Sequence, residues 1–105
     1  GGGVAGVVLH VDRFGNLVTS VRAEAVAGLP GGGATVKVAG RTVELVGTYG
    51  ELGRGKLGAL VGSSGRLEIA VREGSAARAL KARRGMPIVV SRTRPGSTRS
   101  ARGRS

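Results

Sequence analysis

Residues Val11 to Ser20 read VDRFGNLVTS, a short turn signal set between two apolar runs. The preceding run, Val4 to Val11, is rich in β-branched residues and predicts a strand. Asp12 to Gly15 interrupts that strand with residue types that favour turns and tolerate left-handed backbone. From Leu17 to Arg22, apolar and polar residues alternate, which is typical of a second strand with one buried face.

The rest of the chain repeats this arrangement of short strands and glycine-rich turns. Ala39-Gly40-Arg41 is expected to be a tight hairpin, Gly47 to Gly58 to be largely a long loop, and Ala23 to Gly28 is ambiguous. The other predicted strands are Ala34–Val38, Thr42–Val46, Leu57–Val61, Arg66–Arg72 and Met86–Ser91.

One helix is predicted, from Ser75 to Arg83. Ser75 can serve as its N-cap, basic residues crowd its last turn, and Gly85 is expected to end it. About seven short strands and one short helix, with turn signals every ten residues or so, predict an all-β fold: a small antiparallel, Greek-key-like β-barrel.

Composition excludes several classes of protein. The 105 residues allow one domain at most, and the absence of Cys together with a single His argues against a metal site. Two aromatic residues, Phe14 and Tyr49, cannot build a nucleic-acid stacking platform. No apolar run is long enough to span a membrane and no signal peptide is recognised, so we expect a cytoplasmic protein that does not contact a membrane.

The net charge of +11 divides between two parts of the chain. Residues 91–105 contain five Arg and no acidic residue, and we expect residues 93–105 to be a disordered tail after a folded domain of residues 1–92. The charge leaves open a basic barrel that binds RNA or DNA, although the basic residues are scattered within the part expected to fold.

Asp12, Phe14 and Asn16 are the chain's only Asp, only Phe and only Asn, and they occupy five consecutive positions. One interpretation is structural: Asp12 and Asn16 bond local amides, and Phe14 caps the core. The other is a binding lip, in which a carboxylate takes an ammonium, a ring stacks on a flat group, and an amide reads the edge of a heterocycle.

The stretch VGSSGRLEIAVREG, Val61 to Gly74, offers a second candidate site. Ser63 and Ser64, between two glycines, form either an ordinary hairpin turn or a small anion-binding nest. We expect Glu68 to be solvated or paired with an Arg, and His10 to be a plain surface or half-buried residue. Gly55-Lys56 is followed by Leu57, which excludes a P-loop, and no full catalytic set is present.

The chain resembles the C-terminal domain of the S-adenosyl-L-methionine (SAM) hydroxide adenosyltransferase family in four stretches. In chain order they are VDRFGNLVTS, GTYGE, GSSGRLEIAVREGSAARAL and GMPIVV. This family is related to the bacterial SAM-dependent fluorinase and chlorinase. The resemblance implies a larger catalytic N-terminal domain, to which nothing in this chain corresponds, and trimers with SAM bound between domains of neighbouring subunits. It also implies substitution at the 5′ carbon of SAM, by water or by a halide.

Carried over by position, the resemblance gives each candidate residue a role. Asp12 would hold the methionine ammonium, Phe14 and Asn16 would contact adenine, and Ser63 or Ser64 would take the methionine carboxylate. The strand end beginning at Arg72 would also approach adenine. The chain would then be the C-terminal domain of a SAM hydrolase and would be inactive alone. SAM would be the substrate of this enzyme, and no further cofactor would be needed. The alternatives are the nucleic-acid-binding barrel and a structural or oligomerisation module.

Overall fold

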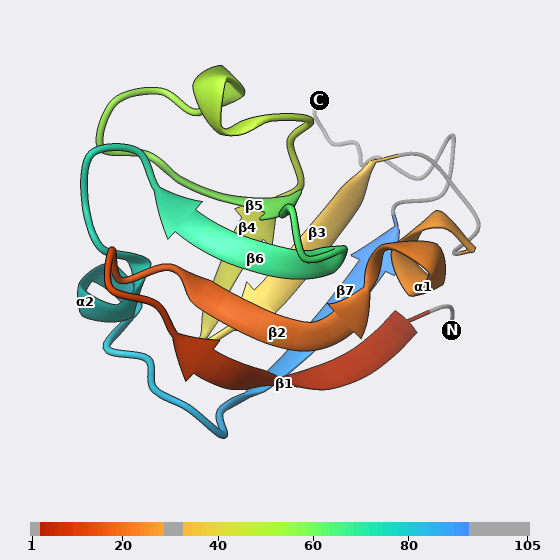
Figure 1. Cartoon of the computed structure of the whole chain (residues 1–105). Coiled ribbons are helices and arrows are strands. Elements are labelled where there is room, and N and C mark those ends of the chain that lie inside the picture. The colour runs from red at the N-terminus through yellow and green to blue at the C-terminus, as the bar shows by residue number, and fades with distance from the viewer. Residues whose placement is uncertain (1–2, 29–32, 93–105) are drawn as a thin grey trace, which may run out of the picture.

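The structure, a computed structural model, describes residues 3–28 and 33–92 of the chain. Within these residues, seven antiparallel strands form one sheet that curls into a nearly closed barrel, accompanied by two short α-helices (Figure 1). The predicted all-β antiparallel barrel is therefore confirmed. The tail of residues 93–105, expected to be disordered, lies outside the described residues.

The order of the strands in the sheet is β4-β3-β7-β1-β2-β6-β5, so the last strand of the chain lies between the third and the first. The strands are β1 (Gly3–Val11), β2 (Leu17–Arg22), β3 (Ala34–Val38), β4 (Arg41–Glu44), β5 (Leu57–Val61), β6 (Arg66–Val71) and β7 (Pro87–Arg92). The helices are α1 (Ala23–Ala27), the 3₁₀ helix η1 (Tyr49–Glu51) and α2 (Ala76–Leu80).

The two edges of the sheet, β4 and β5, meet just beyond the end of β4. Leu45 forms an isolated parallel bridge with Ala59, and the Val46 amide donates to the Ala59 carbonyl over 2.7 Å. This contact satisfies backbone groups that an open edge would expose, and it brings the sheet close to full closure.

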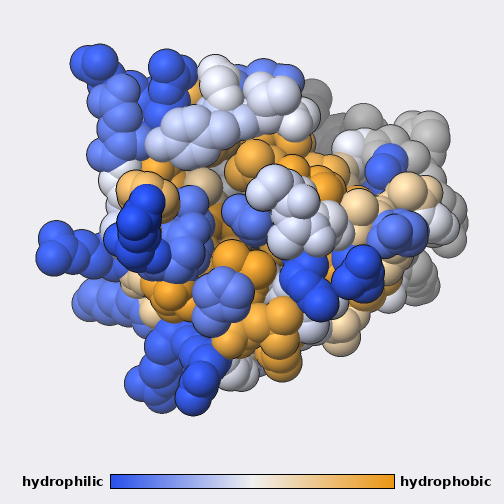
Figure 2. Space-filling model, viewed as in Figure 1, coloured by the Kyte–Doolittle hydropathy of each residue, from blue (hydrophilic) through white to orange (hydrophobic). Residues whose placement is uncertain are grey.

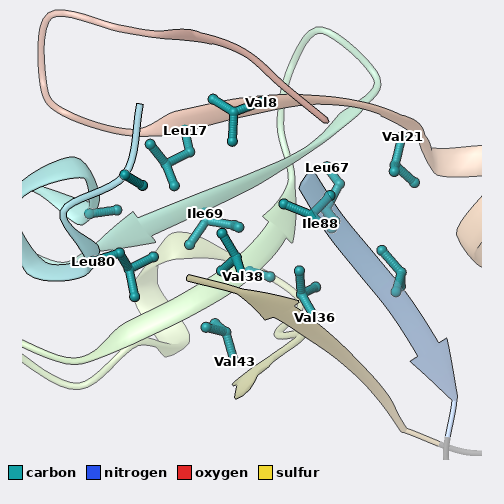
Figure 3. Close-up of a cluster of buried hydrophobic side chains, with 14 of the residues drawn as sticks. Val8, Leu17, Val21, Val36, Val38, Val43, Leu67, Ile69, Leu80 and Ile88 are labelled. Carbon is teal, nitrogen blue, oxygen red and sulfur yellow. The ribbon is translucent and has the colours of Figure 1, made fainter. Parts of the chain in front are cut away.

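The alternation predicted for β2 places Leu17, Thr19 and Val21 inside the barrel, where they are almost fully buried. The Thr19 hydroxyl donates to the Leu67 carbonyl at 2.8 Å, so the one buried polar side chain among the described residues is satisfied. These residues meet the inward side chains of the other strands (Figure 3), the largest of which are Val8, Val36, Leu67, Ile69, Ile88 and Val90.

The structure corrects the predicted helices. The ambiguous segment after β2 contains helix α1, so the described residues contain two α-helices instead of one. Helix α2 spans only Ala76–Leu80: Ser75 caps it as predicted, but it ends at Lys81, in the left-handed region with φ 52°, and not at Gly85. The early stop turns Ala82 into the core, where it is 8% exposed, a tertiary contact that the local sequence does not reveal.

The Gly47 to Gly58 region is an irregular loop that contains η1 and is packed onto the barrel through Leu52. Leu52 is 4% exposed and lies directly over Gly58 of β5, where any side chain would collide with it. In the described part of the chain, no helix has the length and apolar character needed to cross a membrane.

Candidate functional site

The turn between β1 and β2 is organised by Asp12. One oxygen of its carboxylate accepts hydrogen bonds from the Phe14 amide at 2.9 Å and the Asn16 amide at 3.0 Å. The other oxygen accepts from the Asn16 side-chain amide at 3.3 Å. The local Asx-type bonding considered from the sequence is therefore present, and the two polar side chains hold each other in this structure.

Gly15 anchors this turn to helix α2. Its backbone has φ +83°, and a side chain there would overlap Ser75. Its carbonyl accepts a hydrogen bond from the Ala77 amide at 2.9 Å. Glycine is therefore required here both for its left-handed conformation and for the close approach of the α2 N-terminus.

Phe14 does not cap the core, as one interpretation of the sequence had it. Its side chain is 64% exposed, and the Arg13 guanidinium lies 5.0 Å from the ring centroid. A large apolar ring left in solvent on an ordered turn is available to stack on a flat ligand group.

Ser63 and Ser64 lie at the tip of the β5–β6 hairpin. The Gly65 amide donates to the Gly62 carbonyl at 3.0 Å, and the Ser64 hydroxyl accepts from the Arg66 amide at 3.3 Å. This is the ordinary hairpin that the sequence also allowed. Both serine side chains are exposed, and Ser63 makes no hydrogen bond to the residues that the structure describes.

The Asp12–Asn16 turn and the Ser63–Ser64 turn lie at opposite ends of β2 and β6 (Figure 1). Leu17 pairs with Ile69 at one end, and Arg22 pairs with Arg66 at the other. At about 3.3 Å per strand residue, the turns are roughly 15–20 Å apart. The structure does not gather their side chains into one cluster, so a single ligand could contact both turns only by lying along the barrel's outer face.

Arg72, at the end of β6, faces the Gly47 to Gly58 loop. Its guanidinium donates to the carbonyls of Gly50 at 3.3 Å and Leu52 at 2.9 Å. The Arg72 side chain thus fastens a neighbouring loop. The backbone from Arg72 to Gly74, which the resemblance placed near adenine, leads to Ser75, whose side chain lies against Gly15 of the Asp12–Asn16 turn.

Tyr49 is an exposed aromatic residue at this same end of the barrel that the sequence reasoning did not single out as a site residue. Its hydroxyl accepts a hydrogen bond from the Glu73 amide at 2.8 Å, while its side chain remains 42% exposed. Glu73 is two residues from Ser75, which touches Gly15 beside Phe14. The signal that could have pointed to Tyr49 is the rarity of aromatic residues, because Phe14 and Tyr49 are the only two in the chain. Both lie on loops that contact the segment from Glu73 to Ser75.

Between the two turns, a row of four side chains crosses the outer face of the barrel. His10 pairs with Val18, Val18 with Glu68, and Glu68 with Leu60, on the face opposite the buried Leu17 and Ile69. Burial raises the pKa of the Glu68 carboxyl, the negative charge of Asp12 raises it further, and His10 lowers it. Glu68 is thus neither fully solvated nor paired with an Arg among the described residues, contrary to expectation.

No group of three or more His, Cys, Asp or Glu side chains in residues 3–28 and 33–92 is arranged to hold a metal ion. The side chains available at the outer face offer hydrogen bonds, charge and aromatic surface. Such groups suit the recognition of a polar organic ligand.

Comparison with known proteins identifies the family. The family model described as the SAM hydroxide adenosyltransferase C-terminal domain matches residues 6–89. The chain belongs to this family. The match contains the Asp12–Asn16 turn, the Ser63–Ser64 turn and the four strands between them in sequence, so the resemblance inferred from these motifs is confirmed.

Individual relatives agree with this assignment. The chain is 43% identical over 86 residues to the "(R)-S-adenosyl-L-methionine hydrolase" of Thermus thermophilus, a match covering 82% of this chain and 31% of the relative. A crystal structure of a conserved hypothetical protein, also from Thermus thermophilus, is similar, with a TM-score of 0.71 and 45% identity, over 84% of this chain and 35% of that one.

An uncharacterised conserved protein from Thermotoga maritima also shares the fold, with a TM-score of 0.72 and 28% identity, over 86% of this chain and 36% of that one. The chain thus spans about a third of the length of the relatives that it matches.

Proposed function

We propose that this chain is the SAM-binding C-terminal domain of a SAM hydrolase, which converts SAM and water into adenosine and methionine. The observation that carries the proposal is the family match over residues 6–89, together with 43% identity to a relative named as an (R)-SAM hydrolase. In this proposal SAM is a substrate, no further cofactor is required, and the domain is inactive without its catalytic partner.

The proposed ligand lies along the outer face, with adenine near the Asp12–Asn16 turn. The exposed rings of Phe14 and Tyr49 would supply apolar contact surface, and Asn16 would read the edge of the purine. The backbone after Arg72 would approach from the other side. To bind a ligand, the Asn16 amide gives up its 3.3 Å bond to Asp12, the longest of the three bonds that the Asp12 carboxylate accepts.

The methionine end would extend toward the Ser63–Ser64 turn. Its carboxylate would take hydrogen bonds from one of these exposed hydroxyls, of which Ser63 is free of bonds to the described residues. Asp12 would act on the ammonium through its negative charge, which already reaches Glu68 on the same face.

The proposed partner of this domain is the larger N-terminal domain of the same enzyme, in a homotrimer. Apart from His10, strand β1 is apolar on both faces. This pattern is typical of strands that are covered on both sides. Figure 2 shows apolar surface over β1. The outward side chains of β1 and β7 are exposed, and we call them the β1–β7 face: Ala5, Val7, Leu9, Pro87 and Val89. The relatives, about three times as long as the matched part, contain further chain that could cover it.

The test is a hybrid enzyme in which residues 6–89 replace the matching third of the Thermus thermophilus relative. We expect the hybrid to release adenosine from SAM, and the 105-residue chain alone to release none. A hybrid that assembles like the intact relative but neither binds SAM nor releases adenosine would contradict the proposal. Binding without turnover would support a SAM-binding module without hydrolase competence.

A further inference from the structure

The turn that follows β6 keeps a glutamate in a backbone conformation that suits glycine. The Gly74 amide donates to the Val71 carbonyl at 3.1 Å, which closes a four-residue turn from Val71 to Gly74. Glu73, the third residue of this turn, has φ 60° in the left-handed region, and Arg72 before it does not. These angles correspond to a type II turn, whose third position favours Gly or Asn. A glutamate at this position is strained and persists only because other contacts hold it.

The contacts that hold Glu73 come from the Gly47 to Gly58 loop. The Tyr49 hydroxyl accepts a hydrogen bond from the Glu73 amide at 2.8 Å, and the Arg54 guanidinium lies 3.1 Å from the Glu73 carboxylate. The Arg54–Glu73 ion pair is largely exposed to water, so it contributes little to stability. Among the described residues, the Tyr49 hydroxyl is the only acceptor of the Glu73 amide. This hydroxyl is therefore the main side-chain contact that holds the strained residue.

The strained turn lies where the adenine end of the ligand is proposed to bind. Two residues after Glu73, the Ser75 side chain lies against Gly15 of the Asp12–Asn16 turn. The carbonyls of Glu73 and Gly74 accept no hydrogen bond from any residue that the structure describes. A backbone carbonyl is an acceptor, and the 6-amino group of adenine is a donor that it could take.

We propose that Tyr49 is a positioning residue for the purine: its hydroxyl holds the strained Val71–Gly74 turn in the conformation that presents the free carbonyls to the 6-amino group of adenine. This inference rests on the proposed SAM-binding function and concerns the adenine end of that same site. It gives the hydroxyl a role separate from the apolar contact made by the ring. A purine with an oxygen at position 6 offers an acceptor in place of the donor, so the held turn disfavours it.

The test compares two ligands that differ only at position 6 of the purine, S-adenosyl-L-homocysteine and S-inosyl-L-homocysteine. Their binding to the 105-residue chain is measured by NMR titration, which detects weak binding. Tyr49→Phe removes the hydroxyl and keeps the ring. We expect the Kd of the adenosyl ligand to rise roughly five- to tenfold and that of the inosyl ligand to change less than about twofold. Thr48→Val removes the neighbouring hydroxyl, which bonds only Glu51 in the described structure, and as the matched control should change neither Kd.

A second substitution tests whether the hydroxyl acts through the turn. Glycine adopts φ 60° without strain, so Glu73→Gly keeps the turn and removes the need for the hydroxyl. Glu73→Gly alone should bind both ligands as the wild type does, and adding Tyr49→Phe to it should raise the Kd of the adenosyl ligand far less than Tyr49→Phe does alone. If the hydroxyl contacts the ligand directly, Glu73→Gly will not restore the affinity, and the proposal is overturned.

The remaining outcomes separate this proposal from the proposed function. Unchanged affinity in Tyr49→Phe would overturn the positioning role, as would an equal loss for both ligands, which would mean that the hydroxyl only supports the fold. In both cases, binding of the adenosyl ligand to the wild-type chain leaves the SAM-binding function standing. If the wild-type chain binds neither ligand, the SAM-binding function itself fails, and the positioning role of Tyr49 fails with it.

Discussion

At the scale of single residues, the outer face of this barrel keeps groups that do little for the fold. Phe14 is the chain's only phenylalanine, yet its side chain is 64% exposed instead of filling the core. Glu68 carries a carboxylate that the protein itself does not neutralise in the described structure. Residues that cost stability or contribute none are expected where a ligand supplies the missing contact.

Replacing Phe14 by Ala tests this argument. Because the ring is mostly in solvent, Phe14→Ala should change the free energy of unfolding by less than about 0.5 kcal/mol. Stacking of a base on an aromatic ring is worth about 1–3 kcal/mol, so the Kd for SAM should rise roughly tenfold. Urea unfolding and a SAM titration measure the two effects, and a large stability loss with unchanged affinity would show that the ring serves the fold.

The residue pattern drew attention to the side chains of the Asp12–Asn16 turn but could not choose between a structural and a binding role. The structure shows the Asp12 carboxylate bonded within its own turn, and it leaves Phe14 free. Glu68 was misjudged, since its lack of a partner depends on the register of β2, β6 and β5 and not on its neighbours in sequence.

At the scale of elements, strands were predictable because alternation and turn residues are local signals. The end of α2 was not predictable in this way, because it depends on burying Ala82. The bounds of β4 were also displaced: the predicted strand began one residue late and ended two residues late. The separation of the two candidate turns along β2 and β6 was also beyond local reasoning. It follows from strand pairings between residues about fifty positions apart, such as Leu17 with Ile69.

The loop that carries Tyr49 gives the element-scale prediction. One nitrogen of the Arg72 guanidinium, Nη1, donates to two carbonyls of this loop, and the shorter Lys side chain does not carry its ammonium as far. In Arg72→Lys, hydrogen exchange at the amides of Leu52 and Glu73 should become several-fold faster, because the loop opens more often. Arg78→Lys, at an exposed position on α2, is the control, and equal exchange rates in both variants would show that Arg72 does not hold the loop.

At the scale of the whole molecule, the barrel has two outer surfaces of different character on neighbouring strands. The polar face with its two turns lies on β2, β6 and β5, while the β1–β7 face is apolar. Because β1 and β2 are adjacent, a domain that covers the apolar face would also border the proposed SAM-binding face. This arrangement suits the proposed division of roles, in which this domain binds SAM and a second domain supplies the chemistry.

The β1–β7 face can be tested in the hybrid with the Thermus thermophilus relative. Val89 is 42% exposed and lies in register with Ala5, so Val89→Lys places a charge in the middle of this face. The variant should leave the isolated chain folded, because water solvates an exposed Lys, but it should weaken assembly of the hybrid and lower its melting temperature by several degrees. Val61→Lys, at a side chain 40% exposed on β5, is matched in residue type and exposure and should assemble normally. Light scattering measures the size of the assembled hybrid for both variants. Normal assembly of Val89→Lys would mean that this apolar face remains open to water in the complete enzyme.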